Sequence, residues 1–184
     1  MGFSNDGIAW DSSNIGAGQP WSAVQLGGSD GNTIIATATG TATVYRAVLT
    51  TDGSSTVVPA TWNTSTASST DIKGIAYGAG KWIAMGETGT TSTSTDGGAT
   101  WSSGSAVTLD GTEKYSDIVF GNNCWVASLD NADRIIYSAD GSTWYDSGLV
   151  GDSGREDWKV AYTQGVFLAV SSTCLLYTSP SPRD

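Results

Sequence analysis

The sequence predicts an all-β fold built from repeated four-stranded units, and three observations support this. A polar turn with Asp-Gly at its centre recurs at Asp6, Asp52, Asp96 and Asp140, at intervals of 46, 44 and 44 residues. A fixed period of this size is typical of repeat architectures. Short stretches rich in β-branched and aromatic residues lie between the turns, as expected of strands. The 24 glycines, with many Ser and Thr residues, supply the connections.

Residues 1–10 precede the first unit, and they begin almost directly with a turn. Its strands are expected where apolar residues alternate between Gly-rich or polar turns. These are residues 21–27, 33–37, 43–49 and 57–62, with residues 63–70 as a Ser/Thr-rich connector. The later units repeat the pattern with tighter hairpins. Their expected strands are residues 75–78, 81–85 and 91–94, then 118–121, 124–128 and 134–138, then 160–162 and 166–170.

The units align residue by residue on their first strands. One position holds Val24, Ile75, Ile118 and Val160, and the position two residues later holds Leu26, Tyr77, Phe120 and Tyr162. A spacing of two places both sets on one face of the strand. The second strand is apolar at consecutive positions, as in residues 82–85, so both of its faces are expected to be buried.

Four short strands per unit, covered on both faces by neighbouring units, make the blade of a β-propeller. The sequence therefore predicts a propeller of four-stranded antiparallel blades, about four in number or part of a larger ring that includes further blades of a longer protein. The strand near Ala9 and Trp10 is expected to complete the last blade, because the sequence starts where a fourth strand belongs.

Composition excludes several functional classes. The net charge of −10 would repel a phosphate backbone, so nucleic acid is not an expected partner. The chain has no histidine, which removes Ser-His-Asp and Cys-His triads and His-ligated zinc. No apolar run is long enough for a membrane helix, and no signal peptide is visible. No cofactor is expected, and the acidic loop residues Asp130 and Asp133 lack the spacing of an EF-hand calcium loop.

The last eleven residues, 174–184, resemble the translation of a transposase-type sequencing-library adapter. This resemblance divides the chain into a propeller at residues 1–173 and an adapter-derived tail at 174–184. It would make Cys124 the only genuine thiol, whereas an authentic tail would leave a pairing of Cys124 with Cys174 open. The alternative interpretation takes residues 175–178 as an ordinary third strand of the last unit, because they are similar to residues 135–138.

The motif Ser/Thr-x-Asp-Gly-x-x-Thr-Trp resembles the Asp-box, or BNR repeat, of sialidases, sortilin-type receptors, xyloglucan-degrading enzymes and a photosystem assembly factor. The turn from Asp96 to Trp101 matches it fully, and the turn from Asp140 to Trp144 is one residue shorter. The resemblance implies that the boxes lie on the side of the propeller away from an active site. The residues expected to be structural are Asp6, Asp52, Asp96, Asp140, Trp10, Trp101 and Trp144.

A ligand site should contain residues that break the repeat. Asp117 stands where the other units have Ala23, Gly74 and Lys159. The further candidates lie in loops expected on the face opposite the boxes. They are Glu87, Asp130, Asp133, Arg134 and Trp158. Trp158 is also a sugar-stacking candidate, together with Trp21 and Trp62, and the alternative role of all three tryptophans is packing.

The expected function is a non-catalytic binding or structural module that presents loops to a glycan or a protein surface, in a phage tail or a secreted surface protein. The setting would thus be extracellular or in a virion. The rival is a fragment of a sialidase-like or xyloglucanase-like glycoside hydrolase. The sialidase pattern, an arginine triad with a Phe/Tyr-Arg-Ile-Pro motif, is absent from this sequence. The sequence therefore identifies no catalytic residue.

Overall fold

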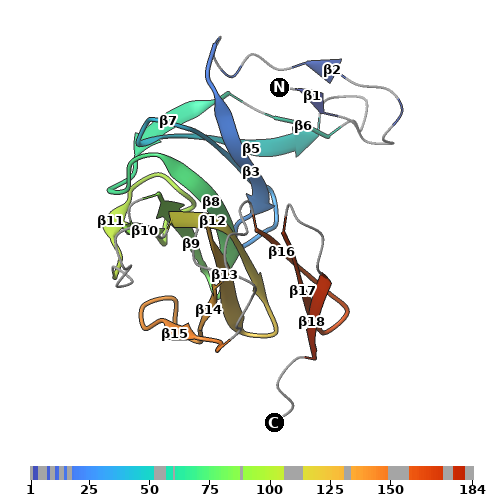
Figure 1. Cartoon of the computed structure of the whole chain (residues 1–184). Coiled ribbons are helices and arrows are strands. Elements are labelled where there is room, and N and C mark those ends of the chain that lie inside the picture. Colours follow the sequence, from blue (N-terminus) through green and yellow to red (C-terminus); the bar gives the residue numbers. More distant parts are fainter. Residues whose placement is uncertain are drawn as a thin grey trace.

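The computed structural model describes residues 2–3, 8, 11–12, 15, 18–51, 57–59, 61–87, 89–105, 114–130, 134–148, 158–171 and 176–180. Within these residues all regular structure is β-strand, and the strands form four successive antiparallel sheets, here called blades 1 to 4, plus one short N-terminal pair (Figure 1). Predicted sites at Asp6, Trp10, Asp52, Asp133 and Cys174 lie outside the described residues.

Blade 1 contains β3 (Trp21–Gly27), β4 (Thr33–Ala38), β5 (Thr43–Thr51), β6 (Val57–Pro59) and β7 (Asn63–Thr66). Blade 2 contains β8 (Ile72–Gly78), β9 (Lys81–Gly86), β10 (Thr91–Ser94) and β11 (Ser102–Ser103). Blade 3 contains β12 (Lys114–Gly121), β13 (Cys124–Asp130), β14 (Arg134–Ser138) and β15 (Tyr145–Asp146). Blade 4 contains β16 (Lys159–Thr163), β17 (Val166–Val170) and β18 (Leu176–Pro180) among the described residues.

The outer strand of blade 1 differs from the prediction. A single strand was expected at residues 57–62, followed by a connector, but two strands pair with β5. β6 pairs with Leu49–Thr51, and β7 pairs with Thr43–Arg46. The prediction was wrong for residues 63–66 because a Ser/Thr-rich stretch carries no apolar alternation, while its backbone groups complete the free edge of β5.

The N-terminal strands β1 (Gly2–Phe3) and β2 (Asp11–Ser12) pair with each other. Residues 9 and 10, which were expected to complete blade 4, lie outside the described residues. In blade 4, β18 pairs antiparallel with β17 along its whole length, so the chain between residues 176 and 180 takes the place of a third strand.

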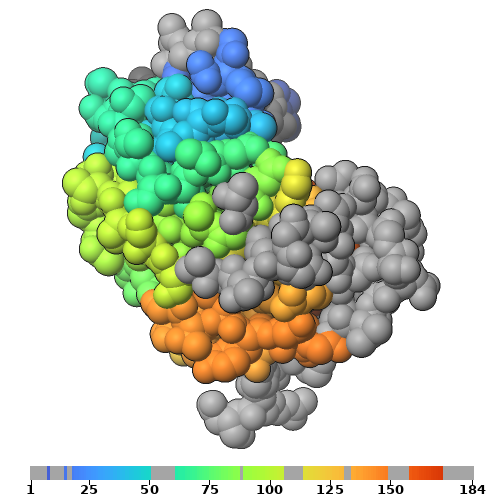
Figure 2. All heavy atoms as spheres, turned by 60° about the vertical axis from the view of Figure 1, so that its left-hand side comes forward, coloured from blue at the N-terminus to red at the C-terminus, as the bar shows by residue number. Residues whose placement is uncertain are grey.

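The innermost strands β3, β8, β12 and β16 follow one another in chain order, and each contacts the next. Blades 1 to 3 are visible as consecutive bands of colour, from blue to orange, in Figure 2. Each inner strand is joined to the second strand by a two-residue turn in the later blades. Both turn residues have positive φ at Ala79-Gly80, Asn122-Asn123 and Gln164-Gly165, as a type I′ hairpin requires.

The core lies between the blades rather than within one sheet. Blades 1 and 2 enclose a cluster around Ile35, Val44, Ile75 and Trp82, and blades 2 and 3 enclose one around Ile83, Ile118 and Trp125. A smaller cluster between blades 3 and 4 contains Val126, Trp158, Val160 and Ala169. Both faces of β9 are buried, as its unbroken apolar run predicted.

A glycine and an aromatic ring meet at each junction between successive inner strands. A Cβ atom added to Gly78 would lie 2.0 Å from Cγ of Phe120 in the next blade, and one added to Gly121 would lie 2.2 Å from the ring of Tyr162. At Gly27 the corresponding distance to Cβ of Tyr77 is 2.4 Å. The ring therefore occupies the space of the absent side chain, and this glycine sets the spacing of the blades.

Candidate functional site

The face expected to bind ligand is formed by the connectors between blades and the loops between second and third strands, and is here called the connector face. The side chains of Asp71, Lys73, Glu87 and Lys114 lie together on it. Lys73 Nζ is 3.3 Å from both Asp71 Oδ1 and Glu87 Oε2, and Lys114 pairs with the other oxygen of Glu87. Glu87 raises the pKa of Lys114 through its hydrogen bond and charge.

This charged cluster joins three consecutive units. Asp71 Oδ1 also accepts the backbone N–H of Gly40 in blade 1 at 2.8 Å, while Lys114 begins the inner strand of blade 3. A hydrogen bond with Glu87, the N–H of Gly40 and the ammonium of Lys73 lower the pKa of Asp71. Glu87 is thus balanced by two lysines, an arrangement that holds neighbouring blades together.

Asp117 lies on β12, immediately after a bulge in the pairing of β12 with β13. Its Oδ1 accepts the N–H of Ile118 at 2.9 Å, and its Oδ2 accepts the N–H of Val160, on the inner strand of blade 4, at 3.2 Å. Desolvation by burial raises the pKa of the carboxyl, opposed by these hydrogen bonds and by the charge of Lys159. Both oxygens therefore bind backbone, and one of them links blade 3 to blade 4.

Trp158 does not occupy a ligand-facing position. Its side chain is fully buried between blades 3 and 4, and its carbonyl accepts hydrogen bonds from Ser116 and Ser128. Asp130 Oδ1 accepts its backbone N–H at 3.3 Å. Trp158 therefore takes the alternative role of packing, because the connector turns its ring into the junction, and Asp130 helps to hold it there.

The remaining candidate on β14, Arg134, forms an ion pair in which its Nε lies 2.8 Å from Asp146 Oδ2 on β15. Arg134 and Glu87, both predicted site residues, therefore belong to two separate ion-paired groups.

Among the described residues no set of three or more His, Cys, Asp or Glu side chains could hold a metal ion. Within the same residues, no helix is long and apolar enough to cross a membrane.

The Asp-Gly turns lie on the opposite face, between the third and fourth strands. Asp96 Oδ1 accepts the N–H groups of Ala99 and Thr100 at 3.0 and 2.9 Å. Asp140 Oδ1 accepts those of Ser142 and Thr143, each at 2.7 Å. The carboxylates thus satisfy backbone donors that the tight turn leaves unpaired.

Each turn also docks on the preceding blade. Arg46 Nε donates to the carbonyl of Gly97 at 3.0 Å, and Ser65 Oγ donates to that of Gly98 at 2.8 Å. Trp101 Nε1 donates in turn to Ser65 Oγ at 3.0 Å. The turn of blade 3 docks in the same way, because the ammonium of Lys81 in blade 2 donates to the carbonyl of Asp140. The turns therefore fasten one blade to the next, and not only the two strands that they connect.

We expect these turns to make the stability of the fold sensitive to acid. Hydrogen bonds lower the pKa of Asp96 to about 2, and the hydroxyl of Thr100 makes the largest contribution. Hydrogen bonds also lower the pKa of Asp140 to about 2, where the N–H of Thr143 makes the largest contribution. Both values lie below the unfolded value near 3.8, so the contribution is complete above pH 4 and is lost as the pH falls towards 2.

Thermal unfolding between pH 5 and pH 2 measures this effect. The double variant D96N/D140N should have a lower Tm at pH 5 and a flatter pH profile, because neither turn then titrates. Parallel profiles for the variant and the parent chain would contradict the assignment.

Tyr137 and Tyr145 form an exposed aromatic pair that was not among the predicted site residues. They face each other across β14 and β15, with ring centroids 5.7 Å apart and an interplanar angle of 32°. Their side chains are 41% and 54% exposed. The alternation of β14, in which Ile136 is buried, places Tyr137 on the opposite face, and this signal was available in the sequence.

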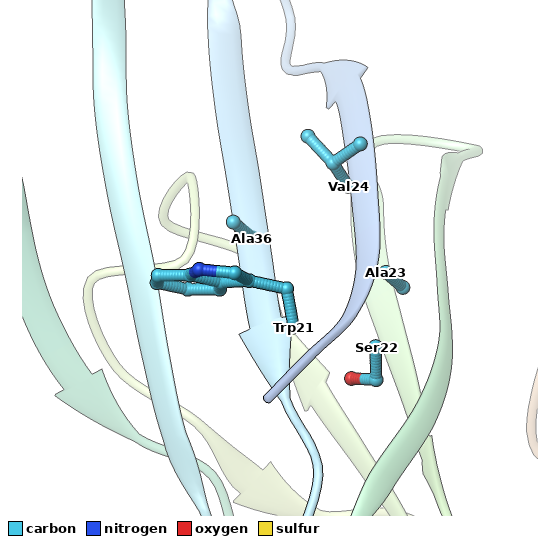
Figure 3. Close-up of a pocket in the computed structure, with 5 residues that line it drawn as sticks. All are labelled: Trp21, Ser22, Ala23, Val24 and Ala36. Atoms are coloured by element: carbon cyan, nitrogen blue, oxygen red, sulfur yellow. The ribbon is translucent and has the colours of Figure 1, made fainter. Parts of the chain in front are cut away.

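A pocket of about 360 Å³ lies on blade 1 and is lined by Trp21, Ser22, Ala23, Val24 and Ala36. The indole of Trp21 extends across the strand that carries Ala36 (Figure 3). The same ring makes an edge contact with Tyr45, with centroids 5.0 Å apart. Trp21 is 41% exposed, so the pocket is a shallow apolar surface at the open side of blade 1.

Comparison with known proteins identifies the architecture. No family model and no curated protein matches the chain. Among solved structures it is similar to the computationally designed Ika4 protein, with a TM-score of 0.61 and 10% identity over 92% of this chain and 96% of that one. It is also similar to the WD40 β-propeller domain of Doa1, with a TM-score of 0.60 and 12% identity over 90% of this chain and 53% of that one. The fold is a β-propeller.

A third similar structure is YCF48 from Cyanidioschyzon merolae, with a TM-score of 0.57 and 15% identity over 92% of this chain and 59% of that one. The propeller described here thus spans between half and three fifths of the Doa1 and YCF48 chains. The likeness confirms the predicted propeller of antiparallel blades. Identities this low establish the fold alone, so function has to be inferred from the residues of this chain.

Proposed function

We propose that this propeller is a non-catalytic binding module that recognises a neutral oligosaccharide through the surface of Tyr137 and Tyr145. The single observation behind the proposal is that two exposed tyrosine rings lie side by side on the outer strands of blade 3. Flat aromatic rings with a polar edge provide apolar stacking area for a sugar face and hydroxyl groups for hydrogen bonding.

The two strands that carry Tyr137 and Tyr145 are also held together by an ion pair. The ion pair between Arg134 and Asp146 joins the same two strands but points to the other face, because its residues alternate with the tyrosines along β14 and β15. Removal of a ring therefore leaves β15 attached. The net charge of −10 disfavours acidic glycans, which is why a neutral sugar is proposed.

The bonding of the candidate carboxylates supports a non-catalytic role. A glycosidase needs a carboxylic acid and a carboxylate free to act on the scissile bond. Asp117 instead accepts two backbone N–H groups, and Glu87 is paired with two lysines. We further propose that the turns at Asp96 and Asp140 are Asp-boxes and that the module acts on a virion or secreted surface, where glycans are presented.

A glycan array, followed by calorimetric titration of each neutral hit, tests the proposal. We expect Tyr137→Ala and Tyr145→Ala each to weaken binding at least tenfold, while the Phe variants, which keep the rings, stay within about threefold. Trp21→Ala is the matched control, because Trp21 has the same 41% exposure as Tyr137 but lies on blade 1. Its binding should equal that of the parent chain.

Two outcomes would overturn the proposal. The first is no neutral glycan bound, or binding that is unchanged in both Ala variants. The second is hydrolysis of a bound glycan that is abolished by Asp117→Asn, which would establish the rival glycosidase.

A further inference from the structure

The two ends of the blade array present apolar sheet faces of the kind that is buried between blades. On blade 1, Val24 is 57% and Leu26 is 49% exposed, whereas Ile75 and Ile118, at the positions equivalent to Val24, are 4% exposed. The pairing register supports this equivalence, because Val24 faces Ala36 just as Ile75 faces Ala84 and Ile118 faces Ala127. Along β3, the face of blade 1 that points away from blade 2 is thus an exposed junction surface, whereas Ala36 beside it on β4 is buried.

Blade 4 presents the opposite half of a junction. Ala161 and Thr163 of β16 are exposed, as is Val170 of β17, at 42%. Ala161 takes the position of Ala76, which is 3% exposed between blades 2 and 3. Ala161 pairs with Leu168, and Thr163 pairs with Val166, so this face continues as an apolar surface onto the second strand.

The residues at the two ends also match in size. At each internal junction a glycine of one blade accepts an aromatic ring from the next: Gly27 with Tyr77, Gly78 with Phe120 and Gly121 with Tyr162. At the ends both members change together. Blade 4 has Thr163 where the other blades have glycine, and blade 1 has Leu26 where the others have the ring. A larger residue on one face is therefore matched by a smaller residue on the other.

We propose that the exposed face of blade 1 docks on the exposed face of blade 4 of a second copy of this chain. The contact is the same kind of interface that the chain forms three times internally, with Thr163 of one copy against Leu26 of the other. Val24 and Leu26 on one face, and Ala161 and Thr163 on the other, are exposed in the part of the chain that the structure describes.

Such a contact is head-to-tail, since different surfaces of the two copies meet. Two such contacts close a ring of two chains and eight blades, which lies within the usual range of propellers. The pocket at Trp21 would lie in this interface, because Val24 and Ala36 of the junction surface line it (Figure 3). The proposal does not depend on glycan binding.

Light scattering coupled to size exclusion, over a range of concentrations, measures the assembly. We expect the 184-residue chain to have twice its mass of 18.9 kDa. Leu26→Arg and Ala161→Arg, each at an exposed position on one of the two faces, should each weaken association at least tenfold. Ser103→Arg, on the exposed outer strand of blade 2, is the control and should remain dimeric.

Mixing the two disrupted variants distinguishes head-to-tail docking from any symmetric contact. Leu26→Arg keeps its blade 4 face and Ala161→Arg keeps its blade 1 face, so an equimolar mixture should form a 1:1 dimer through the one intact junction. Near-ultraviolet circular dichroism confirms that each variant is folded. A parent chain that stays at 18.9 kDa, or a mixture of folded variants that stays monomeric while the parent dimerises, would overturn the proposal.

Discussion

Trp82→Ala should reduce the free energy of unfolding by about 3 to 5 kcal/mol, the cost of emptying a fully buried tryptophan site. The side chain of Trp82 has no exposed surface, lies in the cluster between blades 1 and 2, and contacts the ring of Tyr77 at a centroid distance of 5.1 Å. The surrounding residues belong to two different sheets, so the cavity cannot close without moving one blade towards the other. Urea unfolding monitored by circular dichroism measures the change.

Trp82→Phe is the matched variant and should cost less than about 1.5 kcal/mol, as a swap of one aromatic ring for another. Blade 4 carries Phe167 at the equivalent position, opposite Tyr162. Moreover, the indole N–H of Trp82 has no hydrogen-bond partner among the described residues, so its removal sacrifices no bond there. Equal losses in the Ala and Phe variants would show that the ring volume is not what matters at this junction.

Gly78→Ala should cost about 3 kcal/mol, at the upper end of the usual effect of overpacking. The new Cβ would meet three atoms of the Phe120 ring at 2.0, 2.2 and 2.6 Å. Phe120 cannot retreat easily, because its ring also packs on that of Trp125 with centroids 4.7 Å apart. The blades would therefore have to separate, and urea unfolding should show the loss as a lower midpoint.

A double-mutant cycle tests whether glycine and ring are coupled. In Gly78→Ala combined with Phe120→Leu, the smaller side chain makes room for the new methyl group, as Leu26 does for Thr163 in the proposed contact between copies. We expect the double variant to be more stable than the sum of the single effects by at least about 1 kcal/mol. Ser103→Ala, on an exposed strand, should change stability by less than about 0.5 kcal/mol. Additive single effects would refute the coupling.

The fold could be predicted because each blade repeats the same local pattern. The first-strand alignment places Ile75, Ile118 and Val160 opposite alanines in the observed register, so the 44-residue spacing was a reliable guide. The outer strand of blade 1 could not be predicted in the same way. Residues 63–66 have no apolar face, and they pair with β5 only because the tertiary arrangement leaves that edge available.

The site was harder to predict, because a charged residue in a loop looks the same whether it binds a ligand or a neighbouring blade. Asp117 breaks the repeat, yet its carboxylate accepts the N–H of Val160. Glu87 was expected to face a ligand, and it bridges two lysines from two blades. Trp158 was expected near the ligand face and lies in the core. In each case at least one partner comes from another unit, which the spacing along one strand does not reveal.

The sequence by itself determined the blade, because alternation, hairpin turns and the Asp-Gly motif act within about 44 residues and need no distant partner. Only the tertiary structure decided what each blade contacts. Three kinds of contact join residues that the chain brings together from different blades: the glycine and ring at each junction, the hydrogen bond from Val160 to Asp117, and the docking of the Asp96 turn on Arg46. The physical reason is that packing and hydrogen bonding act over a few ångströms in space, whatever the separation along the chain.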